Sequence, residues 1–242
     1  MLYSIFFVGA LLRLYALSSV PPSASLDEAS LGYNAYSILR TGMDEYGNPF
    51  PFLLRAYDDW RPGLYVYLVV PAVAFFGLNA FAVRFPSFLL SILTMYIAWD
   101  IARFVSSSIE KKGKNAEYMP MFTVFLLAIS PWHIYMSRLG HEVNLGVFVL
   151  TFAVYLFFLY VKNERPRFLY ASSALFGLSL ATYQSERLVS PLVALLLVWL
   201  YREILMRKPT TMVKAVCIWC VFTLPTAYVL IQPEARIRLT GT

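Results

Sequence analysis

The residues best suited to chemistry gather in the first third of the chain, in a segment that contains no lysine. Asp27 and Glu28 stand next to each other shortly after the first apolar stretch, and Asp59 and Arg61 follow in the run D-D-W-R-P-G-L-Y. A carboxylate can remove a proton as a general base. An arginine at a helix start can hold an anion such as phosphate. The segment therefore indicates acid–base chemistry beside a phosphate site.

The same residues also have purely structural explanations. Ser25 and Glu28 have the spacing of a capping box, in which each side chain binds the backbone of the other. Asp27 is favourable at a helix start by charge alone. Arg61 can equally pair with Asp58 or Asp59. Residue types and spacing leave both explanations open.

A second polar group, S-R-L-G-H-E, lies in a short turn between two apolar stretches and contains Arg138, His141 and Glu142. Arginine and glutamate at such places often anchor a helix at the membrane interface. His133 and His141 do not recur with metal-ligand spacing, so the sequence favours no dedicated zinc site.

The elements that must position these residues are transmembrane helices. The chain is 59% hydrophobic and 14% charged, more apolar than one soluble core can bury. A helix that crosses a bilayer needs about 20 apolar residues. Seven stretches approach this length, and they predict an all-α integral membrane fold: 2–20, 85–105, 119–136, 143–161, 168–183, 188–205 and 212–231.

The charge pattern predicts the topology. The net charge of +6 does not indicate nucleic acid binding, because the basic residues lie between the apolar stretches. All six lysines fall in or beside three loops, which the positive-inside rule makes cytoplasmic. The acidic loop 21–84 and the turns that contain Arg138 and Arg187 then lie outside. We expect one membrane module over residues 1–242, and the unclosed tail after residue 231 indicates a partial chain.

Two short helices are expected inside the external loop. Leu31, Ala35 and Ile38 recur at helical spacing, so residues 25–40 form an amphipathic helix at the membrane surface. Residues 62–77 are apolar but would span only about 24 Å, and Pro71 interrupts them. We expect this second helix to be half-inserted.

The order of these motifs resembles the GT-C fold glycosyltransferases. The segments that carry the resemblance are S-L-D-E-A-S-L-G-Y-N-A-Y, D-W-R-P-G-L-Y-V-Y-L, G-L-N-A-F-A-V-R-F-P-S-F and S-P-W-H-I-Y-M-S-R-L-G-H-E. They are most similar to the branch of protein O-mannosyltransferases and bacterial aminoarabinose transferases. The resemblance covers essentially the whole chain, as the amino-terminal half of such enzymes.

This resemblance implies roles for individual residues. Asp27 and Glu28 correspond to the acidic pair at the catalytic centre, and Glu142 to a further catalytic carboxylate. The implied substrate-binding residues are Arg61, Arg138, His141, Arg187, Tyr65 and Asp59. Arg187 can also simply pair with the neighbouring Glu186. Two departures stand out: arginine replaces the usual lysine or histidine of a basic-Pro-Pro-Leu segment, and Gly63 replaces its second proline.

The implied activity is transfer of a sugar from a polyprenyl-phosphate donor at the outer face of the plasma membrane. Asp27 would act as base while arginines stabilise the departing lipid phosphate. The acceptor is left open among protein, lipid and polysaccharide, and membrane lipids are the remaining partners. No cofactor is certain, although a divalent cation bound by Asp27 or Glu142 is left open. A secondary transporter and a non-catalytic membrane scaffold are the alternatives.

Overall fold

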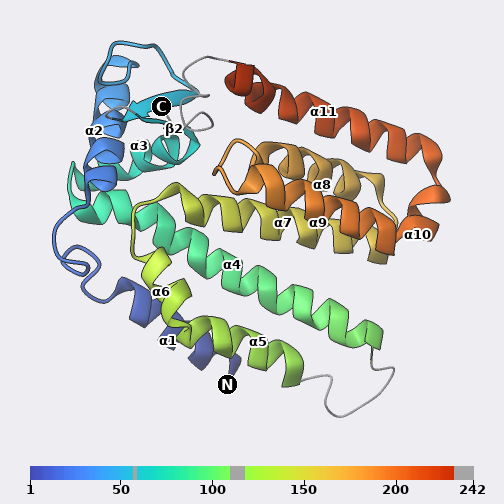
Figure 1. Cartoon of the computed structure of the whole chain (residues 1–242). Coiled ribbons are helices and arrows are strands. Elements are labelled where there is room, and N and C mark those ends of the chain that lie inside the picture. Colours follow the sequence, from blue (N-terminus) through green and yellow to red (C-terminus); the bar gives the residue numbers. More distant parts are fainter. Residues whose placement is uncertain (57–58, 110–117, 232–242) are drawn as a thin grey trace. The chain divides into compact units, whose positions relative to one another are not determined.

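A computed structural model describes residues 1–56, 59–109 and 118–231 (Figure 1). These residues form two compact units. Of the described residues, 1–54, 63–109 and 118–148 belong to the first unit, and 55–56, 59–62 and 149–231 belong to the second. Compactness does not decide whether the units act together, so the single module expected over 1–242 stays a prediction.

The first unit is built from six helices and the start of a seventh. They are α1 (Leu2–Leu14), α2 (Leu26–Thr41), α3 (Leu64–Phe76), α4 (Ala80–Ile109), α5 (Tyr118–Ile129), α6 (Pro131–Ser137) and the first residues of α7 (Glu142–Asn163). Helix α2 packs on α3 and α4, while α1 packs on α4, α5 and α6. The buried face of α2 contains Leu31, Ala35 and Ile38, as the helical spacing predicts.

The boundaries of α2 follow from local chemistry. Ser25 accepts a hydrogen bond from the Glu28 amide, and the Glu28 carboxylate accepts one from the Ser25 amide, so both halves of the capping box are present. Gly42 ends the helix with a φ of +73°, a backbone conformation that glycine adopts without a steric penalty. The predicted helix over residues 25–40 is therefore confirmed to within one residue at each end, and its place at the membrane surface stays a prediction.

Helix length separates the predicted membrane spans into two groups. Among the described residues, α4 over Ala80–Ser108, α7 and α11 over Pro209–Tyr228 are long and apolar enough to cross a bilayer. Helices α5 and α6 make a fourth span if they are taken together, with a bend of 60° between them. The other predicted spans are shorter helices. Helix α3 has only 13 residues, about 20 Å, which agrees with the expected half-inserted helix.

The bend between α5 and α6 has a chemical cause at Pro131. In an unbroken helix the Leu127 carbonyl would accept from residue 131, but proline has no amide hydrogen. Arg13 on α1 replaces it, since its guanidinium donates to Leu127 O at 2.8 Å and to Ala128 O at 3.0 Å. Arg13 also contacts His133 Nδ1 at 2.7 Å. The expected continuous span over 119–136 is therefore two helices.

The first predicted span is also shorter than expected. Helix α1 ends at Leu14 instead of reaching Val20, because Ala16 adopts a φ of +51° and the chain turns before Pro21 and Pro22. A further difference is a two-stranded hairpin, β1 (Leu53–Ala56) with β2 (Asp59–Pro62). Strands of four residues between a proline-rich segment and a helix have no pattern that a period-two analysis detects.

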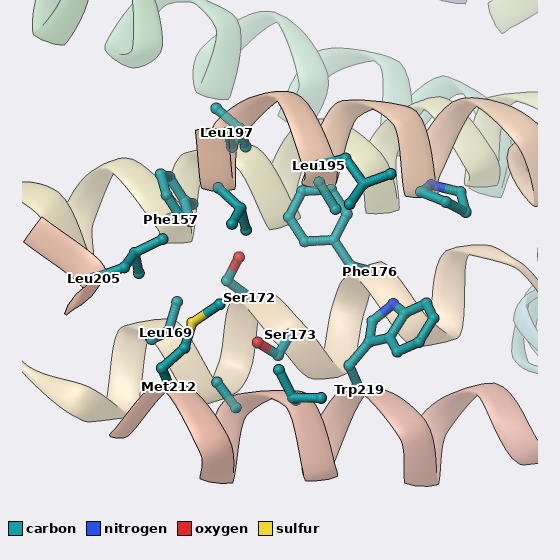
Figure 2. A pocket seen from close by; sticks show the side chains of 15 residues that line it. Phe157, Leu169, Ser172, Ser173, Phe176, Leu195, Leu197, Leu205, Met212 and Trp219 are labelled. Atoms are coloured by element: carbon teal, nitrogen blue, oxygen red, sulfur yellow. The ribbon is translucent and has the colours of Figure 1, made fainter. Parts of the chain in front are cut away.

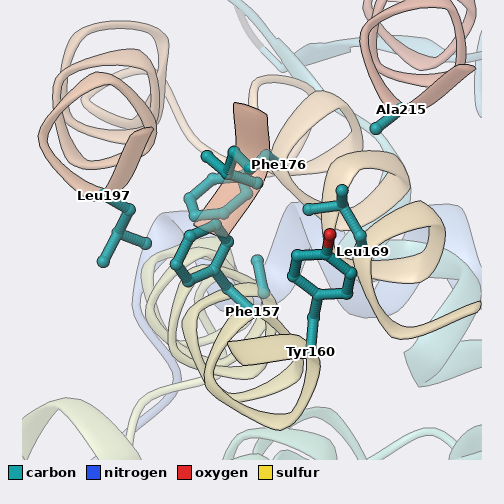
Figure 3. Close-up of a cluster of buried hydrophobic side chains, with 8 residues drawn as sticks. Phe157, Tyr160, Leu169, Phe176, Leu197 and Ala215 are labelled. Atoms are coloured by element: carbon teal, nitrogen blue, oxygen red, sulfur yellow. The ribbon is translucent and has the colours of Figure 1, made fainter. Parts of the chain in front are cut away.

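The second unit consists of the rest of α7, α8 (Pro166–Ser179), α9 (Glu186–Leu200), α10 (Arg202–Met206) and α11 (Pro209–Ile231), together with residues 55–62. Its core joins Phe157 and Tyr160 on α7 to Leu169 and Phe176 on α8, as Figure 3 shows. Helices α8 and α11 approach closely at Gly177, where an added Cβ would lie 2.9 Å from the Trp219 carbonyl oxygen.

Candidate functional site

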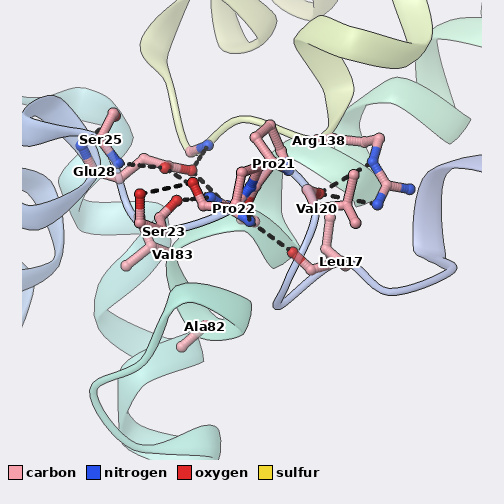
Figure 4. Close-up of polar contacts among 12 residues, drawn as sticks. Leu17, Val20, Pro21, Pro22, Ser23, Ser25, Glu28, Ala82, Val83 and Arg138 are labelled. Carbon is pink, nitrogen blue, oxygen red and sulfur yellow. Dashed lines mark hydrogen bonds and ion pairs between the residues drawn. The ribbon is translucent and has the colours of Figure 1, made fainter.

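A buried ion pair organises the polar end of the first unit. Arg84, which is 0% exposed, holds the Glu28 carboxylate with two hydrogen bonds of 2.7 and 2.9 Å. Its remaining hydrogens go to the carbonyl oxygens of Leu17, Pro21 and Ser23. Figure 4 shows Glu28 beside Ser23 and Ser25, within this network. Arg84 therefore ties the segment after α1 to the start of α2.

The same carboxylate also holds the turn before α7. Glu28 Oε1 accepts a hydrogen bond of 2.9 Å from the Gly140 amide. Gly140 packs so closely on α4 that an added Cβ would lie 2.5 Å from Val83 Cγ1 and 2.9 Å from Val83 O. Only glycine fits without a shift of α4 or of the turn. This contact fixes the backbone immediately before His141 and Glu142.

Asp27, His141 and Glu142 meet at this place. Asp27 Oδ2 lies 3.8 Å from His141 Nε2, and Glu142 Oε2 lies 3.5 Å from His141 Nδ1. The Val143 amide lies 3.3 Å from Nδ1 and donates to it in the tautomer that has its proton on Nε2. In that tautomer the His141 N–H is on the nitrogen nearer Asp27. The Asp27 side chain is 42% exposed and that of Glu142 is 6% exposed, so Asp27 is the carboxylate open to a substrate.

The contacts of Glu28 revise its predicted catalytic role. Burial raises the pKa of the Glu28 carboxyl, but the hydrogen bonds from Arg84, Gly140 and Ser25 outweigh it, so the pKa lies below its ordinary value. Glu28 stays ionised and both oxygens are occupied. A base needs a free lone pair at the reacting proton. The geometry makes Glu28 a positioning residue for its neighbours.

Arg138 likewise differs from the phosphate-binding role that the family resemblance implied. It is 6% exposed, and its guanidinium donates to five backbone carbonyls within 3.3 Å, those of Leu12, Arg13, Tyr15, Ala16 and Val20. These carbonyls belong to the end of α1 and the turns after it; of the five, that of Ala16 also accepts from the Ser19 and Val20 amides. Arg138 stabilises the end of α1, and no donor is left for phosphate.

The predicted substrate-binding residues between α2 and α4 are Asp59, Arg61 and Tyr65, and the structure places them differently. Tyr65 on α3 is 0% exposed and its hydroxyl donates to Val83 O at 2.9 Å, so it packs inside the first unit instead of binding substrate. Arg61 ends β2 and is 7% exposed. The Asp59 side chain and the whole of Asp58 lie outside the described residues, so their predicted roles stay predictions.

The turn before α9, residues 184–187, belongs to the second unit. Burial raises the pKa of the Glu186 carboxyl to about 7, and burial lowers the pKa of the neighbouring Arg187. Within the described ranges the two side chains form no ion pair, so the simple pairing considered from sequence is wrong. Arg187 Nε is buried without a hydrogen-bond partner among those residues. A half-buried cation with spare donors suits an anionic ligand.

Two residues, Arg84 and Glu186, were not identified from the sequence as candidates for the site. Arg84 was placed before the second span, whereas it lies inside α4, and a charged residue inside an apolar helix is a signal of function that could have found it. Glu186 was treated only as a partner for Arg187. Within residues 1–56, 59–109 and 118–231, no three His, Cys, Asp or Glu side chains are placed to hold a metal ion. The divalent cation remains an open expectation.

The helical membrane fold is that of a GT-C type glycosyltransferase. Residues 61–228 match a family model described as dolichyl-phosphate-mannose-protein mannosyltransferase. Because the match covers well over half of the chain, the protein belongs to this family. The expected all-α GT-C fold is thereby confirmed. Comparison with curated protein sequences gives no match.

A solved structure supports the same fold. The crystal structure of ArnT from Cupriavidus metallidurans, bound to undecaprenyl phosphate, superposes with a TM-score of 0.69 at 15% sequence identity. The alignment covers 98% of this chain and 41% of the ArnT chain. At that identity the likeness establishes the fold. The chain thus spans about two fifths of the length of the enzyme it resembles.

Proposed function

We propose that this chain forms the amino-terminal part of an enzyme that transfers a sugar from a polyprenyl phosphate to an acceptor at the non-cytoplasmic membrane face. The observation that carries the proposal is the Asp27–His141 contact, 3.8 Å long, in a chain that belongs to a lipid-phosphate mannosyltransferase family. The known ArnT structure contains undecaprenyl phosphate, which suggests the same class of carrier lipid here. The sugar and the acceptor are left open.

Asp27 is the proposed general base. Its carboxylate is exposed, whereas the two neighbouring carboxylates are buried, and it begins a helix whose start is held by the Glu28–Arg84 pair. With its proton on Nε2, His141 would interact with the Asp27 carboxylate and help to orient it. An acceptor proton would pass to Asp27 as the hydroxyl oxygen attacks the anomeric carbon and the bond to the lipid phosphate breaks.

Arg187 and Arg61 are the proposed contacts of the lipid phosphate. Negative charge grows on the phosphate as it departs, and arginines that are already desolvated stabilise that charge most strongly. Arg187 is half-buried with one unused donor, and Arg61 is buried at the end of β2. Arg138 is excluded from the proposed phosphate contacts because all of its N–H donors bind backbone carbonyls.

The decisive experiment is Asp27→Asn in the protein that contains this chain. Asparagine keeps the size of the side chain but cannot accept a proton at neutral pH, and general-base assistance contributes about 100-fold to 10,000-fold to rate. Transfer of labelled sugar should fall by that factor, while binding of carrier lipid is unchanged. Polyprenyl-phosphate mannose and polyprenyl-phosphate aminoarabinose are tested separately as donors.

Asp100→Asn provides the matched control. Asp100 lies in α4, paired with Arg103 at 3.2 Å, and should leave transfer unchanged. Near-normal transfer in Asp27→Asn would remove Asp27 from the role and make Glu142 the next candidate. If the parent protein binds carrier lipid but transfers neither sugar, a scaffold or a transporter replaces the enzyme as the function.

A further inference from the structure

The second unit encloses an apolar cavity of about 350 Å³ among α7, α8, α9, α10 and α11. Figure 2 shows Met212 and Trp219 on one side, Leu195 and Leu197 on the other, and Phe176 between them. This volume falls within the range of small-molecule sites, about 300–1,000 Å³. The cavity is therefore large enough to hold part of a ligand.

The chemistry of the lining restricts that ligand to an apolar one. All lining residues are apolar except Ser172 and Ser173, and the Ser172 hydroxyl already donates to Ala153 O at 2.8 Å. Leu195 and Val216 are 66% and 48% exposed, so the cavity is open at the surface of the unit. Where this surface faces membrane hydrocarbon, an acyl chain can enter the cavity from the side.

The cavity lies at the basic end of the unit. Its lining residues on α11 belong to the first half of the helix that starts at Pro209, and Leu205 precedes that start. On α8, which starts at Pro166, the lining runs from Leu169 to Phe176. Segments 162–167 and 201–214 contain seven basic and two acidic side chains. Five of the chain's six net positive charges are thus concentrated beside the cavity.

Part of this charge has no carboxylate partner among the described residues. Glu164 binds Lys208 at 2.8 Å and Arg207 at 3.8 Å. Within the part of the chain that the structure describes, Lys162, Arg165 and Lys214 have no carboxylate within 4.0 Å. A positive-inside bias explains why these residues lie on the cytoplasmic side. It does not explain a cavity beneath them.

We propose that the cavity holds one acyl chain of an anionic phospholipid from the cytoplasmic leaflet, with the lipid phosphate among these cations. Basic sites between helices on this side are suited to anionic headgroups. The polyprenyl chain of the donor is the competing occupant. Its phosphate candidate Arg187 lies at the other end of α9 from these cations, about 20 Å along the helix, but only about 6 Å from the lining residue Pro191. The proposal does not depend on the transfer reaction.

Trp219 provides a direct probe, because it lines the cavity. A variant that keeps only this tryptophan is placed in phosphatidylcholine vesicles containing a few mole per cent of lipid with brominated acyl chains, which quench nearby indole fluorescence. Brominated phosphatidylglycerol should quench Trp219 at roughly three- to tenfold lower mole fraction than brominated phosphatidylcholine. A matched variant that keeps only Trp199, which is 63% exposed, should show no such preference.

Two sets of variants test the two parts of the site. Lys214→Gln combined with Arg165→Gln should abolish most of the preference, whereas Arg103→Gln, an exposed cation in the first unit, should not. Ala194→Phe fills the cavity and should remove quenching of Trp219. Val213→Phe, at a position 62% exposed outside the lining, should leave it unchanged. Circular dichroism checks that each variant is folded.

Three results would overturn the proposal. The first is equal quenching of Trp219 by the two headgroups. The second is an unchanged preference in the folded charge variant, which decides the matter even if Ala194→Phe does not fold. The third is relief of quenching by undecaprenyl phosphate at the mole fraction at which phosphatidylglycerol relieves it, since the cavity would then belong to the donor. Sugar transfer is assayed separately, so its failure leaves these readouts intact.

Discussion

Glu28→Gln distinguishes a residue that only caps a helix from one that holds the site together. The capping box alone predicts a small effect, because glutamine also caps. In the structure, Glu28 Oε2 accepts from the Ser25 amide at 3.0 Å and from Arg84 Nη2 at 2.9 Å. If the glutamine NH2 group takes the place of Oε2, it faces the N–H donors of Ser25 and Arg84. If the amide is flipped, the NH2 group takes the place of Oε1 and faces the Gly140 amide and Arg84 Nε, which are also donors. Either orientation leaves the buried Arg84 without its counter-charge.

The size of the effect follows from burial. Arg84 is 0% and Glu28 is 2% exposed, and breaking such a pair from one side costs about 3–5 kcal/mol. We expect the free energy of unfolding in detergent micelles, followed by circular dichroism, to fall by this amount in Glu28→Gln. Asp27→Asn is the matched control: it changes the adjacent exposed carboxylate and should cost less than about 1 kcal/mol.

A double-mutant cycle separates the pair from its surroundings. Replacing both Glu28 and Arg84 by methionine removes the unpaired charge, and such apolar replacements are often neutral. The double variant should therefore be more stable than either single variant, with a coupling energy of about 1–3 kcal/mol. The reasoning is refuted if Glu28→Gln loses less than about 1 kcal/mol while the Gly140 amide stays protected from hydrogen exchange.

Three further predictions use the same unfolding measurement. Gly140→Ala should cost about 1–3 kcal/mol, because the new methyl meets Val83; an unchanged stability would mean that the turn can move. Ser25→Ala should cost about 1 kcal/mol by loss of the helix cap, and no loss would contradict the cap. Glu186 has a pKa raised from 4.5 to about 7, so the unfolded state ionises first and stability falls by about 3 kcal/mol as pH rises through that window. Glu186→Gln should flatten this dependence, and an identical pH profile would refute the raised pKa.

The outcome for individual residues shows where local information is sufficient. The start of α2 was predictable because the Ser25–Glu28 box is made within four residues, and Gly42 ends the same helix by its own backbone preference. Apolar length and periodicity identified the helical segments, since burial in hydrocarbon needs no particular partner. The family resemblance added Asp27 and Glu28 as an acidic pair at the catalytic centre, and the structure showed that Asp27 is the exposed member.

Other features depend on residues far apart in the chain. From sequence Glu28 is a helix cap, whereas in the structure Arg84, 56 residues later, donates to both of its carboxylate oxygens. From sequence Arg138 is a phosphate ligand, whereas in the structure it donates to carbonyls at and after the end of α1, more than 115 residues earlier. In the same way, Arg13 donates a hydrogen bond to the Leu127 carbonyl, which Pro131 leaves without an amide partner. Sequence determined which segments are helices and which side chains are chemically competent. Only the tertiary structure decided which of those side chains are already occupied, because a hydrogen bond between distant segments leaves no periodicity and depends on which carbonyls the packing leaves without an amide.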